Sequence, residues 1–505
     1  MGDGAPGKRP ATAIDPQDQA VGKAARTDAL ALNADQCAAL AAALAGANVC
    51  VLGKAGTGKS FVLRHIRAAL EARGRRVAVV AAYASAAHAA GGVTVHSFLK
   101  PLPQPKVWRT RAQFNQMRAA LLDSARKDLS SGTSSGGGGW FRAAHVERMN
   151  EMRGLHTLIF DELSLLSPEL FQLVDATMRA ARRNARPFGG VQLIAVGDPG
   201  QLPPVPMAGE DVRYVFEDDV WCAVDWRSVV LRTVVRQADV EFVELLDAVR
   251  AGELQYFKDW PEPLRERLLA RTTARGARVL DADGNEFPAA RLRATNAKVD
   301  QDNMEALERL PGELRTYPVR VLLPASAGGA WTDGLEAAAS SAGRAEEELR
   351  DAAREGKWRD AVLKEGATVV LTSNLDVNAG LFNGAIGVVQ ALDPAGVRVR
   401  FRGGTALVER VEFPLDDGET RVSVMPLRAA YAFTIDKSQG LTLDACIVSL
   451  TPKMRPGAAY TALSRVRSLD SLVVETPDGM LPADVFERCF VTADAVQGFC
   501  DAMSA

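Results

Sequence analysis

The segment Gly53-Lys54-Ala55-Gly56-Thr57-Gly58-Lys59-Ser60 limits the fold of this chain more than any other feature. It matches the pattern G-x-x-x-x-G-K-[ST], and it lies between an apolar run at 48–53 and an expected helix from about Lys59 to Arg73. Glycines let backbone N–H groups close around phosphates, and the helix N-terminus adds a favourable dipole. The sequence therefore predicts a nucleotide-binding domain of the P-loop type.

Within this loop we expect specific roles for two side chains. Lys59 should reach the β- and γ-phosphates, and the Ser60 hydroxyl should bind Mg²⁺. The residues expected to hold the nucleotide share the turn itself and are Gly53, Ala55, Gly56, Thr57, Gly58, Lys59 and Ser60.

Apolar runs alternate with helical segments, a pattern typical of a parallel sheet covered on both faces. The first expected strands are residues 48–53, 77–82, 156–161 and 191–196, and a helix opens near Ser167-Pro168. A second alternating region begins near Ser228, with a helix at 239–251 and strands near 291–294 and 368–372. The chain is therefore expected to be an α/β protein with more than one domain.

Three segments interrupt this alternation. Residues 100–128 are rich in lysine and arginine, and a Ser/Gly-rich stretch follows them, so we expect an insertion on the first domain. Residues 335–364 are rich in Ala, Glu and Arg and are expected to form a solvent-facing helix. Short β-rich runs from 384 to 413 indicate a small barrel inserted in the second domain.

Two adjacent acids, Asp161 and Glu162, end the expected strand at 156–161. Phosphoryl transfer needs both charge neutralisation and an oriented nucleophile. We therefore expect Asp161 to hold Mg²⁺, directly or through water, and Glu162 to activate the attacking water.

Three more polar residues are candidate catalytic groups. Gln201 follows the strand at 191–196 in Gly197-Asp-Pro-Gly-Gln-Leu-Pro-Pro, where its amide could bond the γ-phosphate and report its loss. Arg236 and Arg465 fall in the second half of the chain. An arginine delivered from another domain can stabilise charge that develops on the γ-phosphate.

Together these segments resemble superfamily 1 helicases of the Pif-type (petite integration frequency) branch, which is related to RecD. Leu32 to Gln36 resembles the adenine-binding segment, and Gly91 to Phe98 resembles a motif that touches single-stranded DNA. The second half matches through Val235-Arg-Gln-Ala-Asp, Thr295-Asn, the run from Gly366 to Gly387, Thr434-Ile-Asp-Lys-Ser-Gln-Gly and Tyr460-Thr-Ala-Leu-Ser-Arg. The resemblance spans about residues 30–475.

This resemblance implies two RecA-like lobes with ATP between them, a wedge on the first lobe and an SH3-like barrel in the second. It also implies 5′-to-3′ movement on DNA and a contact between Gln36 and the base. The expected DNA contacts are Thr94, His96, Ser97, Phe98, Asn383, Thr434 and Lys437. In the insertion, Trp108 or Phe114 is the expected aromatic that blocks the duplex.

The expected organisation places domain boundaries where these patterns change. The boundaries are a flexible tail at 1–28, a first lobe at 29–226 with the wedge at about 100–145, a second lobe at 227–383 and 426–480, the SH3-like insertion at 384–425, and a C-terminal extension at 481–505.

One departure from the family pattern bears on DNA binding. The family usually has His where this chain has Asp436. An acid would repel a DNA phosphate, so this side chain is expected either to face elsewhere or to tune affinity.

Composition limits the remaining classes. The formal charge is −2, so any nucleic acid must be held by local basic patches. No apolar run approaches the length of a membrane span, and no C-x-x-C pair exists among the six cysteines. We expect a reduced intracellular protein that works as a monomer, in the nucleus if Lys8-Arg9 belongs to an import signal, with a mitochondrion or a viral host compartment as alternatives.

The sequence thus predicts an ATP- and Mg²⁺-dependent DNA helicase that acts on single-stranded and forked DNA. Its expected roles are replication, repair, recombination or telomere maintenance. Two alternatives stay open, an RNA helicase and a nucleotide-switch scaffold that binds ATP without translocating.

Overall fold

The computed structural model describes residues 32–504 with gaps. The gaps are 84–85, 88–89, 100–109, 117, 120–146, 207–208, 238, 253–261, 274–278, 281–285, 288, 325–328, 356–357, 374, 377–378, 380, 382–384, 402–403, 416–418, 444, 452–453 and 477–492. The expected tail at 1–28 lies outside the described residues, as do Trp108 and Asn383.

The first lobe is built on a six-stranded parallel sheet with the order β3-β2-β4-β5-β1-β6. Its strands are β1 (Asn48–Gly53), β2 (Val77–Ala81), β3 (Val93–Thr94), β4 (Thr157–Asp161), β5 (Gln192–Gly197) and β6 (Trp226–Leu231). The helices around it are α2 (Ala34–Leu44), α3 (Lys59–Glu71), α5 (Val95–Leu99), α8 (Pro168–Arg182) and α9 (Asp219–Cys222). Four of these strands confirm the runs expected from the sequence.

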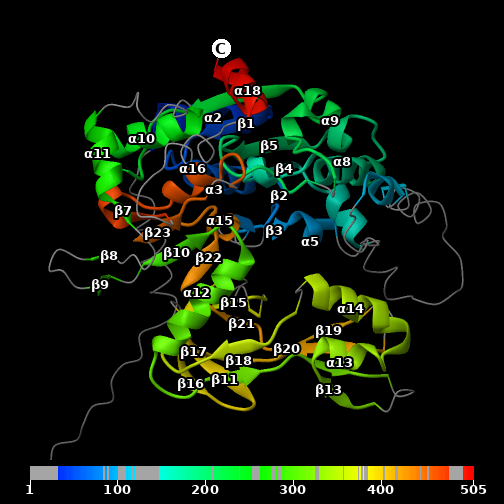
Figure 1. The fold of residues 1–505 in the computed structure, drawn as a ribbon. Coiled ribbons are helices and arrows are strands. Elements are labelled where there is room, and N and C mark those ends of the chain that lie inside the picture. The colour runs from blue at the N-terminus through cyan, green and yellow to red at the C-terminus, as the bar shows by residue number, and fades with distance from the viewer. Residues whose placement is uncertain are drawn as a thin grey trace, which may run out of the picture.

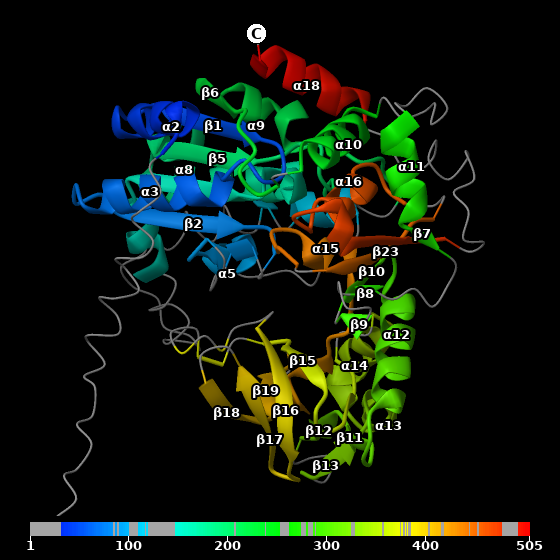
Figure 2. The same cartoon turned by 90° about the vertical axis from the view of Figure 1, so that its left-hand side faces the viewer.

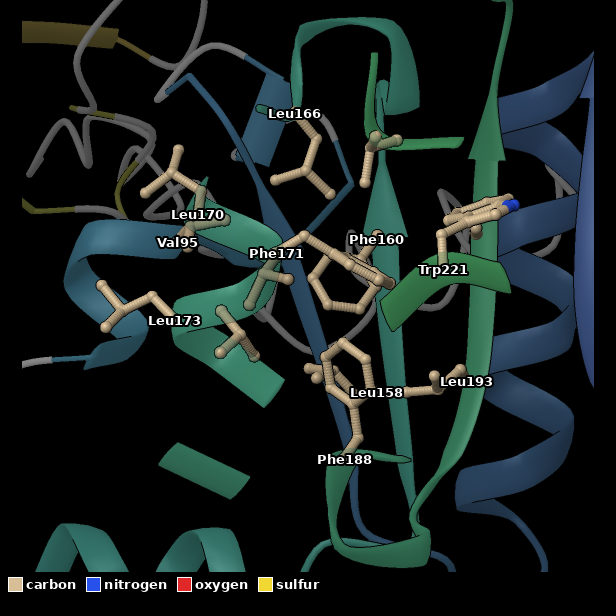
Figure 3. Packing of buried hydrophobic residues seen from close by; sticks show 14 of the residues in the cluster. Val95, Leu158, Phe160, Leu166, Leu170, Phe171, Leu173, Phe188, Leu193 and Trp221 are labelled. Atoms are coloured by element: carbon tan, nitrogen blue, oxygen red, sulfur yellow. The ribbon is translucent and has the colours of Figure 1, made fainter. Parts of the chain in front are cut away.

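Successive side chains of each strand point to opposite sides of this sheet, and helices cover both sides, so both faces are buried. On one face Ile159 packs with residues of α2 and α3. On the other face Phe160 meets Phe171 of α8 at a ring-centroid distance of 5.3 Å, and Phe171 lies 4.7 Å from Phe188 (Figure 3). A continuous apolar strand such as β4 is what a doubly covered sheet requires.

The boundary expected at residue 226 is wrong. Strand β6 pairs in parallel with β1 along its whole length, from Asn48 and Trp226 to Gly53 and Leu231. The pattern of alternation alone does not tell which sheet an apolar strand joins. The first lobe therefore extends to Leu231.

The second lobe has a five-stranded parallel sheet with the order β22-β10-β23-β24-β7. Its strands are β7 (Thr272–Thr273), β10 (Ala290–Arg293), β22 (Ala432–Thr434), β23 (Cys446–Ser449) and β24 (Leu472–Glu475). Its helices are α10 (Val240–Ala251), α11 (Glu262–Ala270), α12 (Asn296–Arg309), α15 (Ile435–Ser438) and α16 (Ala458–Leu463). The hairpin strands β8 (Val279–Leu280) and β9 (Glu286–Phe287) pair with each other.

A β-rich insert separates β10 from β22 and lies below both lobes in Figures 1 and 2. One antiparallel sheet has the order β18-β17-β16-β15-β21 and a second has the order β13-β12-β20-β19, while β11 pairs with β14. The strands are β11 (Arg315–Tyr317), β12 (Arg320–Leu322), β13 (Trp331–Asp333), β14 (Ala361–Leu363), β15 (Thr368–Leu371), β16 (Ile386–Leu392), β17 (Gly396–Phe401), β18 (Gly404–Glu409), β19 (Val411–Pro414), β20 (Arg421–Val424) and β21 (Leu427–Ala429).

The insert is therefore larger than expected from the sequence. It extends from β11 to β21, so the proposed bounds of 384–425 were too narrow, and β15 belongs to the insert rather than to the second lobe. Strands of three or four residues leave too short a pattern to identify in sequence. The SH3-like closure stays a prediction, because the pairings run in an open order from β18 to β21.

The Ala/Glu/Arg-rich stretch at 335–364 does not form a solvent-facing helix. It forms two helices, α13 (Leu335–Ala339) and α14 (Glu346–Glu355), and then strand β14. Leu349 and Ala338 are fully buried in a core shared with β12 and β20. Alanine on the inner face lets these helices pack closely, so the prediction of a solvated surface was wrong.

The basic insertion on the first lobe is described only in part. Phe114 is fully buried in the first-lobe core, so it does not form an exposed block to a duplex. Arg111 forms ion pairs with Glu169 and Glu210 at 2.6 and 2.8 Å, which ties this segment to α8. Both findings show that part of the stretch is structural.

Helix α18 (Asp494–Ser504) returns to the first lobe after the second-lobe sheet is complete. Its Phe499 stacks on Phe216 at a ring-centroid distance of 4.1 Å, and Met503 accepts a hydrogen bond from Ser228 of β6. Figure 2 shows this helix above the first lobe. No helix in the described part of the chain is long and apolar enough to cross a membrane.

Candidate functional site

The phosphate loop joins β1 to α3 at the carboxyl edge of the first-lobe sheet. Gly58 takes a left-handed conformation before the first residue of α3. The Lys59 ammonium donates to the carbonyl oxygens of Gly53 and Lys54 at 2.8 and 3.0 Å. These carbonyl oxygens accept the ammonium hydrogens that phosphate oxygens would accept. The loop therefore has the expected geometry of an anion site.

Glycine at position 56 allows a second segment to approach the loop. Gly56 has a φ of +83°, and a Cβ there would lie 2.3 Å from Gln237 Oε1 and 2.8 Å from Arg236 Cβ. The Gly56 carbonyl accepts the N–H groups of Val235 and Arg236 at 2.8 and 3.1 Å. The segment after β6 is thus fixed to the phosphate loop.

Arg236 consequently does not come from the second-lobe sheet, as the expected boundary at 226 implied. It lies on the connection that leaves the first lobe, and its guanidinium donates to the Ser464 carbonyl of the second lobe at 3.2 Å. Arg236 reaches the seam between the lobes from the first-lobe side.

The two acids lie where β4 ends. Glu162 has a φ of +53°, and its N–H donates to Asp161 Oδ1 at 3.0 Å. Burial, followed by the neighbouring Glu162 charge, raises the pKa of Asp161 to about 7. Two buried adjacent carboxyls next to a lysine form a site that an added cation would stabilise.

This donor set fits Mg²⁺. Asp161 and the exposed Ser60 hydroxyl supply hard oxygen ligands, and no group of three or more His, Cys, Asp or Glu that could hold a metal occurs among the described residues. Magnesium usually takes one or two protein ligands and completes its shell with phosphate and water. We infer that Ser60 and Asp161 would hold the ion.

Gln201 is buried beside Asp198 in the loop after β5. Its Nε2 donates to Asp198 Oδ2 at 3.4 Å, while its Oε1 has no hydrogen-bond partner among the described residues. A buried acceptor without a donor is uncommon and needs an explanation. Water at the reaction centre would supply that donor, whereas the expected bond to the γ-phosphate would need the amide N–H and stays a prediction.

Helix α16 brings the second lobe onto this loop. The Tyr460 hydroxyl donates to Asp198 Oδ2 at 2.9 Å and accepts the N–H of Ala55 in the phosphate loop at 2.7 Å. The Thr461 hydroxyl accepts the N–H of Leu202 at 3.1 Å. These bonds connect the two lobes at the nucleotide site, and sequence analysis had assigned no role to Tyr460.

Asp198 and Arg250 complete this connection. Arg250 Nε of α10 donates to Asp198 Oδ1 at 2.9 Å. Burial alone would raise the pKa of Asp198, but the charges of Arg250 and Lys59 and the Tyr460 hydroxyl hold it below its ordinary value. Arg250 carries no motif signal in the sequence, so its role could be found only from the structure.

Arg465 is almost completely buried, yet within the described part of the chain it donates its hydrogen bonds to neutral oxygens. Its guanidinium donates to Thr461 O at 2.6 Å and to Ser464 Oγ at 2.7 Å. Burial, followed by the nearby charge of Arg236, lowers the pKa of Arg465 to about 10, so it stays charged at neutral pH.

The charges at this seam act on one another. Burial lowers the pKa of the Lys59 ammonium, the carboxylates of Asp198 and Glu162 oppose that change, and the cations Arg236 and Arg465 reinforce it. The structure therefore gathers the expected catalytic side chains around one phosphate loop, with an excess of positive charge suited to a triphosphate.

Gln439 of the second lobe also reaches the catalytic acid. Its Nε2 donates to Glu162 Oε2 and to Ser164 Oγ, both at 3.1 Å. Gln439 lies in the motif Thr434-Ile-Asp-Lys-Ser-Gln-Gly but was not among the expected catalytic residues. It links Glu162 to the segment that carries Lys437.

The expected base-binding residue Gln36 is buried at the start of α2. Its Nε2 donates to Thr57 O at 3.3 Å, and its Oε1 accepts the N–H of Asn33 in a capping box. It therefore touches the phosphate loop, while its contact with a base stays a prediction.

The expected DNA contacts on the first lobe divide into two groups. Thr94 starts the segment, its hydroxyl accepts the Ser97 N–H at 3.1 Å, and the side chains of His96 and Ser97 are exposed. Phe98 is buried in the first-lobe core, under the guanidinium of Arg148 at 5.1 Å from its ring centroid, so the prediction that it contacts DNA was wrong.

On the second lobe Thr434 is buried, and its hydroxyl accepts the N–H of Lys437 at the start of α15. It therefore positions Lys437 rather than presenting its own hydroxyl to a strand. Lys437 is exposed and lines a pocket of about 400 Å³ together with Arg428, Arg359 and Tyr83. Arg359 is paired with Asp300, and the pocket carries a net positive charge near the expected DNA path.

Asp436 forms an ion pair with Arg455. This contact explains how the chain has an acid where the family pattern has His, because the arginine offsets its charge. Arg455 lies just before α16, so the pair also fastens α15 to the segment that carries Arg465.

Comparisons with known proteins agree with this geometry. A family model described as an AAA domain matches residues 31–262, and one described as the 2B domain of the DNA helicase Pif1 matches residues 360–392. The chain is 33% identical over 450 residues to the ATP-dependent DNA helicase PIF1 of Danio rerio, covering 88% of this chain and 61% of that protein. It is 29% identical over 449 residues to the ATP-dependent DNA helicase Pif1 of Bdellovibrio bacteriovorus, covering 87% of each.

Solved structures share the fold. Pif1 helicase from Candida albicans has a TM-score of 0.72 and 25% identity, covering 94% of this chain and 99% of that one. Pif1 helicase from Bacteroides in complex with ADP-AlF3 and single-stranded DNA has a TM-score of 0.64 and 24% identity, covering 98% of each. The chain spans about three fifths of the length of the vertebrate relatives it matches, since it covers 61% of the Danio rerio protein.

Proposed function

This chain belongs to the Pif1 family of DNA helicases, and on that premise we propose that it hydrolyses ATP to move along single-stranded DNA and unwind duplexes. The observation that supports the proposal is the seam between the lobes. The phosphate loop amide of Ala55 bonds Tyr460 of the second lobe, and Arg236 bonds Ser464 across the same seam. A nucleotide-binding protein that is not a motor does not need a second lobe in contact with its phosphate loop.

Hydrolysis at this seam would divide the work among the residues already described. Lys59 leaves its carbonyl acceptors for the phosphates, Glu162 activates the attacking water by accepting its proton, and Gln201 Oε1 accepts a hydrogen bond from that water. Ser60 and Asp161 would hold Mg²⁺, which would neutralise part of the phosphate charge. Arg465 and Arg236 stabilise charge on the γ-phosphate, a contribution worth about 10³- to 10⁵-fold in rate for known arginine fingers.

Movement would follow from the difference between nucleotide states. Nucleotide favours the closed seam only by its higher affinity for that arrangement. Gln439 contacts Glu162, and Lys437 two residues earlier is exposed at the proposed DNA path. A change at the catalytic acid would thus reach a DNA contact through one short segment.

We propose 5′-to-3′ polarity on the strength of the family resemblance. The experiment is strand displacement with duplexes that carry either a 5′ or a 3′ single-stranded tail, with and without Mg-ATP. Unwinding of the 5′-tailed substrate alone is the expected result. Unwinding of the 3′-tailed substrate alone would refute the polarity, and ATPase without any unwinding would refute the motor.

The alternatives are separated by two simple measurements. Stimulation of ATP hydrolysis by poly-dT and not by poly-U favours DNA over RNA. A Lys59→Ala protein that binds DNA but cannot unwind it supports the motor, whereas full cellular function of that variant favours the switch scaffold.

The proposal has further parts. They are action on forked DNA, work as a monomer, a nuclear location, and roles in replication, repair, recombination or telomere maintenance. Sedimentation with a forked substrate tests the monomer.

A further inference from the structure

A second concave site lies at the opposite edge of the first-lobe sheet. A pocket of about 520 Å³ is lined by residues at or just before the amino-terminal ends of its strands, such as Asn48, His156 and Asp225, and by Arg75, Arg182 and Arg186 of the preceding segments. Strand β1 starts at Asn48 and reaches the phosphate loop at Gly53. At ~3.3 Å per residue this strand keeps the pocket on the order of 17 Å from the loop, so the pocket is not part of the nucleotide site.

The charged side chains that line this pocket are mostly positive. Arg75, Arg182 and Arg186 contribute three fixed positive charges, and Asp225 is the opposing acid in the lining. Guanidinium groups that share one pocket repel one another, so a bound anion would stabilise the cluster.

The three arginines differ in how they are held, and Arg75 and Arg186 are the two whose charge is available to a ligand. Arg182 is held in place, because its guanidinium donates to the carbonyl oxygens of Gly189, Arg153 and Leu155 at 2.8 to 2.9 Å. Arg75 and Arg186 are exposed, and within the part of the chain that the structure describes neither forms an ion pair with a carboxylate. The Arg186 guanidinium lies over Gly190, whose missing side chain leaves room for it.

The positive charge continues beyond the pocket. Arg73, Arg76 and Arg153 are exposed on the adjoining surface, where Arg76 lies against Gly154. The whole chain has a formal charge of −2, so this concentration is local and not a result of composition. A face with several separated arginines suits a repeating anion better than a single small one.

We propose that this face binds the backbone phosphates of duplex DNA, at a site separate from the strand that the motor moves along. Arginine forks match phosphate oxygens in pairs, and phosphate contacts of this kind fix position without sequence preference. Sites for single strands combine charge with aromatic side chains on which bases stack. No Phe, Tyr or Trp lines the pocket among the described residues, so the duplex is the better fit.

The test is a charge reversal away from the motor, the variant Arg75→Glu/Arg186→Glu. Fluorescence anisotropy without nucleotide measures the affinity for a blunt duplex and for a dT oligonucleotide across a range of salt concentrations. The matched control is Arg309→Glu, an exposed arginine in the last turn of α12. Removing two phosphate contacts is expected to lower the slope of log affinity against log salt for the duplex by about 2.

Two further measurements make the result decisive. ATP hydrolysis stimulated by dT should be unchanged in the variant, because the site lies apart from the nucleotide seam, and this result keeps the outcome distinct from any failure of the proposed motor. An unchanged duplex affinity and salt slope overturn the proposal, as does loss of binding to a glutamate-rich peptide with duplex binding intact. If the double variant unfolds at a lower temperature than the wild type, Arg75→Gln/Arg186→Gln gives the same test without reversed charge.

Discussion

At the scale of single residues, the catalytic seam is defined by charges whose natural partner is a phosphate. Arg465 is the clearest case, since it is buried and charged and its hydrogen bonds to the described residues all go to neutral oxygens. A buried cation of this kind is costly unless an anion arrives. The site is thus arranged for a charge that forms or binds during the reaction.

We expect Arg465→Ala to lower the kcat of ATP hydrolysis by about 10³-fold or more, with ATP still bound. Steady-state hydrolysis and fluorescent-nucleotide binding measure the two effects separately. The control Arg309→Ala changes an exposed arginine on α12 and should leave kcat unchanged. A kcat for Arg465→Ala close to that of the wild type would exclude this residue from the reaction.

Asp161 predicts a pH dependence of the free protein. Burial and then Glu162 raise its folded pKa from 3.8 to about 7, so the folded state binds this proton more tightly than the unfolded chain. Stability from this group is full below about pH 4 and is lost as pH rises through 7. Thermal unfolding without nucleotide and metal should show this loss, and Asp161→Asn should reduce it. Equal pH profiles for both proteins would contradict the assignment.

Asp436 shows how far a residue-level inference from the sequence can go. Its type predicted a conflict with DNA phosphate, but no pattern indicated that Arg455 would be its partner. Ion pairs between residues far apart in the sequence depend on the fold. The same limit applies to Tyr460 and to Arg250, whose contacts with Asp198 join three segments.

At the scale of elements, helix α16, which ends two residues before Arg465, joins the second lobe to the first. Gly457, the N-cap residue of this helix, lies against the loop of Gln201. A Cβ atom at position 457 would lie 2.4 Å from the Gln201 carbonyl oxygen. Tyr460 forms a hydrogen bond with the phosphate loop, and Thr461 forms one with Leu202 in the loop that carries Gln201. One short helix therefore contacts both nucleotide-binding loops of the other lobe.

We expect Tyr460→Phe to weaken this coupling while the ring stays packed. It removes a hydroxyl that makes two buried hydrogen bonds, at a cost of about 1–3 kcal/mol in unfolding free energy. DNA-stimulated hydrolysis should fall more than basal hydrolysis. Tyr317→Phe is the matched control, because it removes a hydroxyl that bonds Asp393 O at 2.8 Å in the insert. Equal loss of both activities would indicate a structural role only.

The pair of helices α13 and α14 gives a stability test of the corrected insert. Leu349 is fully buried between them and the sheet, so Leu349→Ala should destabilise the protein by about 2–5 kcal/mol. Arg350 beside it is exposed and pairs with Glu346 four residues away, and Arg350→Ala should change stability by at most about 0.5 kcal/mol. Chemical denaturation compares the two. A negligible effect of Leu349→Ala would restore the surface helix expected from the sequence.

At the scale of the whole molecule, local patterns predicted the parts of the fold that have local signals. The phosphate loop, β1, β4, the acids at its end and the order of the motifs follow from strand–turn–helix chemistry. The membership of β6 in the first sheet does not, because its pairing with β1 joins segments about 180 residues apart. The same reason hid most of the insert, whose short strands pair across long loops.

The return of α18 to the first lobe has a mechanical consequence. At its start, the second lobe is joined to the first lobe by the connection after β6. After its end, helix α18 packs on the first lobe. The second lobe is thus tethered twice, so a proteolytic nick in either linker would leave the halves at high effective concentration. In the proposed motor, this double connection would let the lobes rotate relative to each other while keeping them together throughout the ATP cycle.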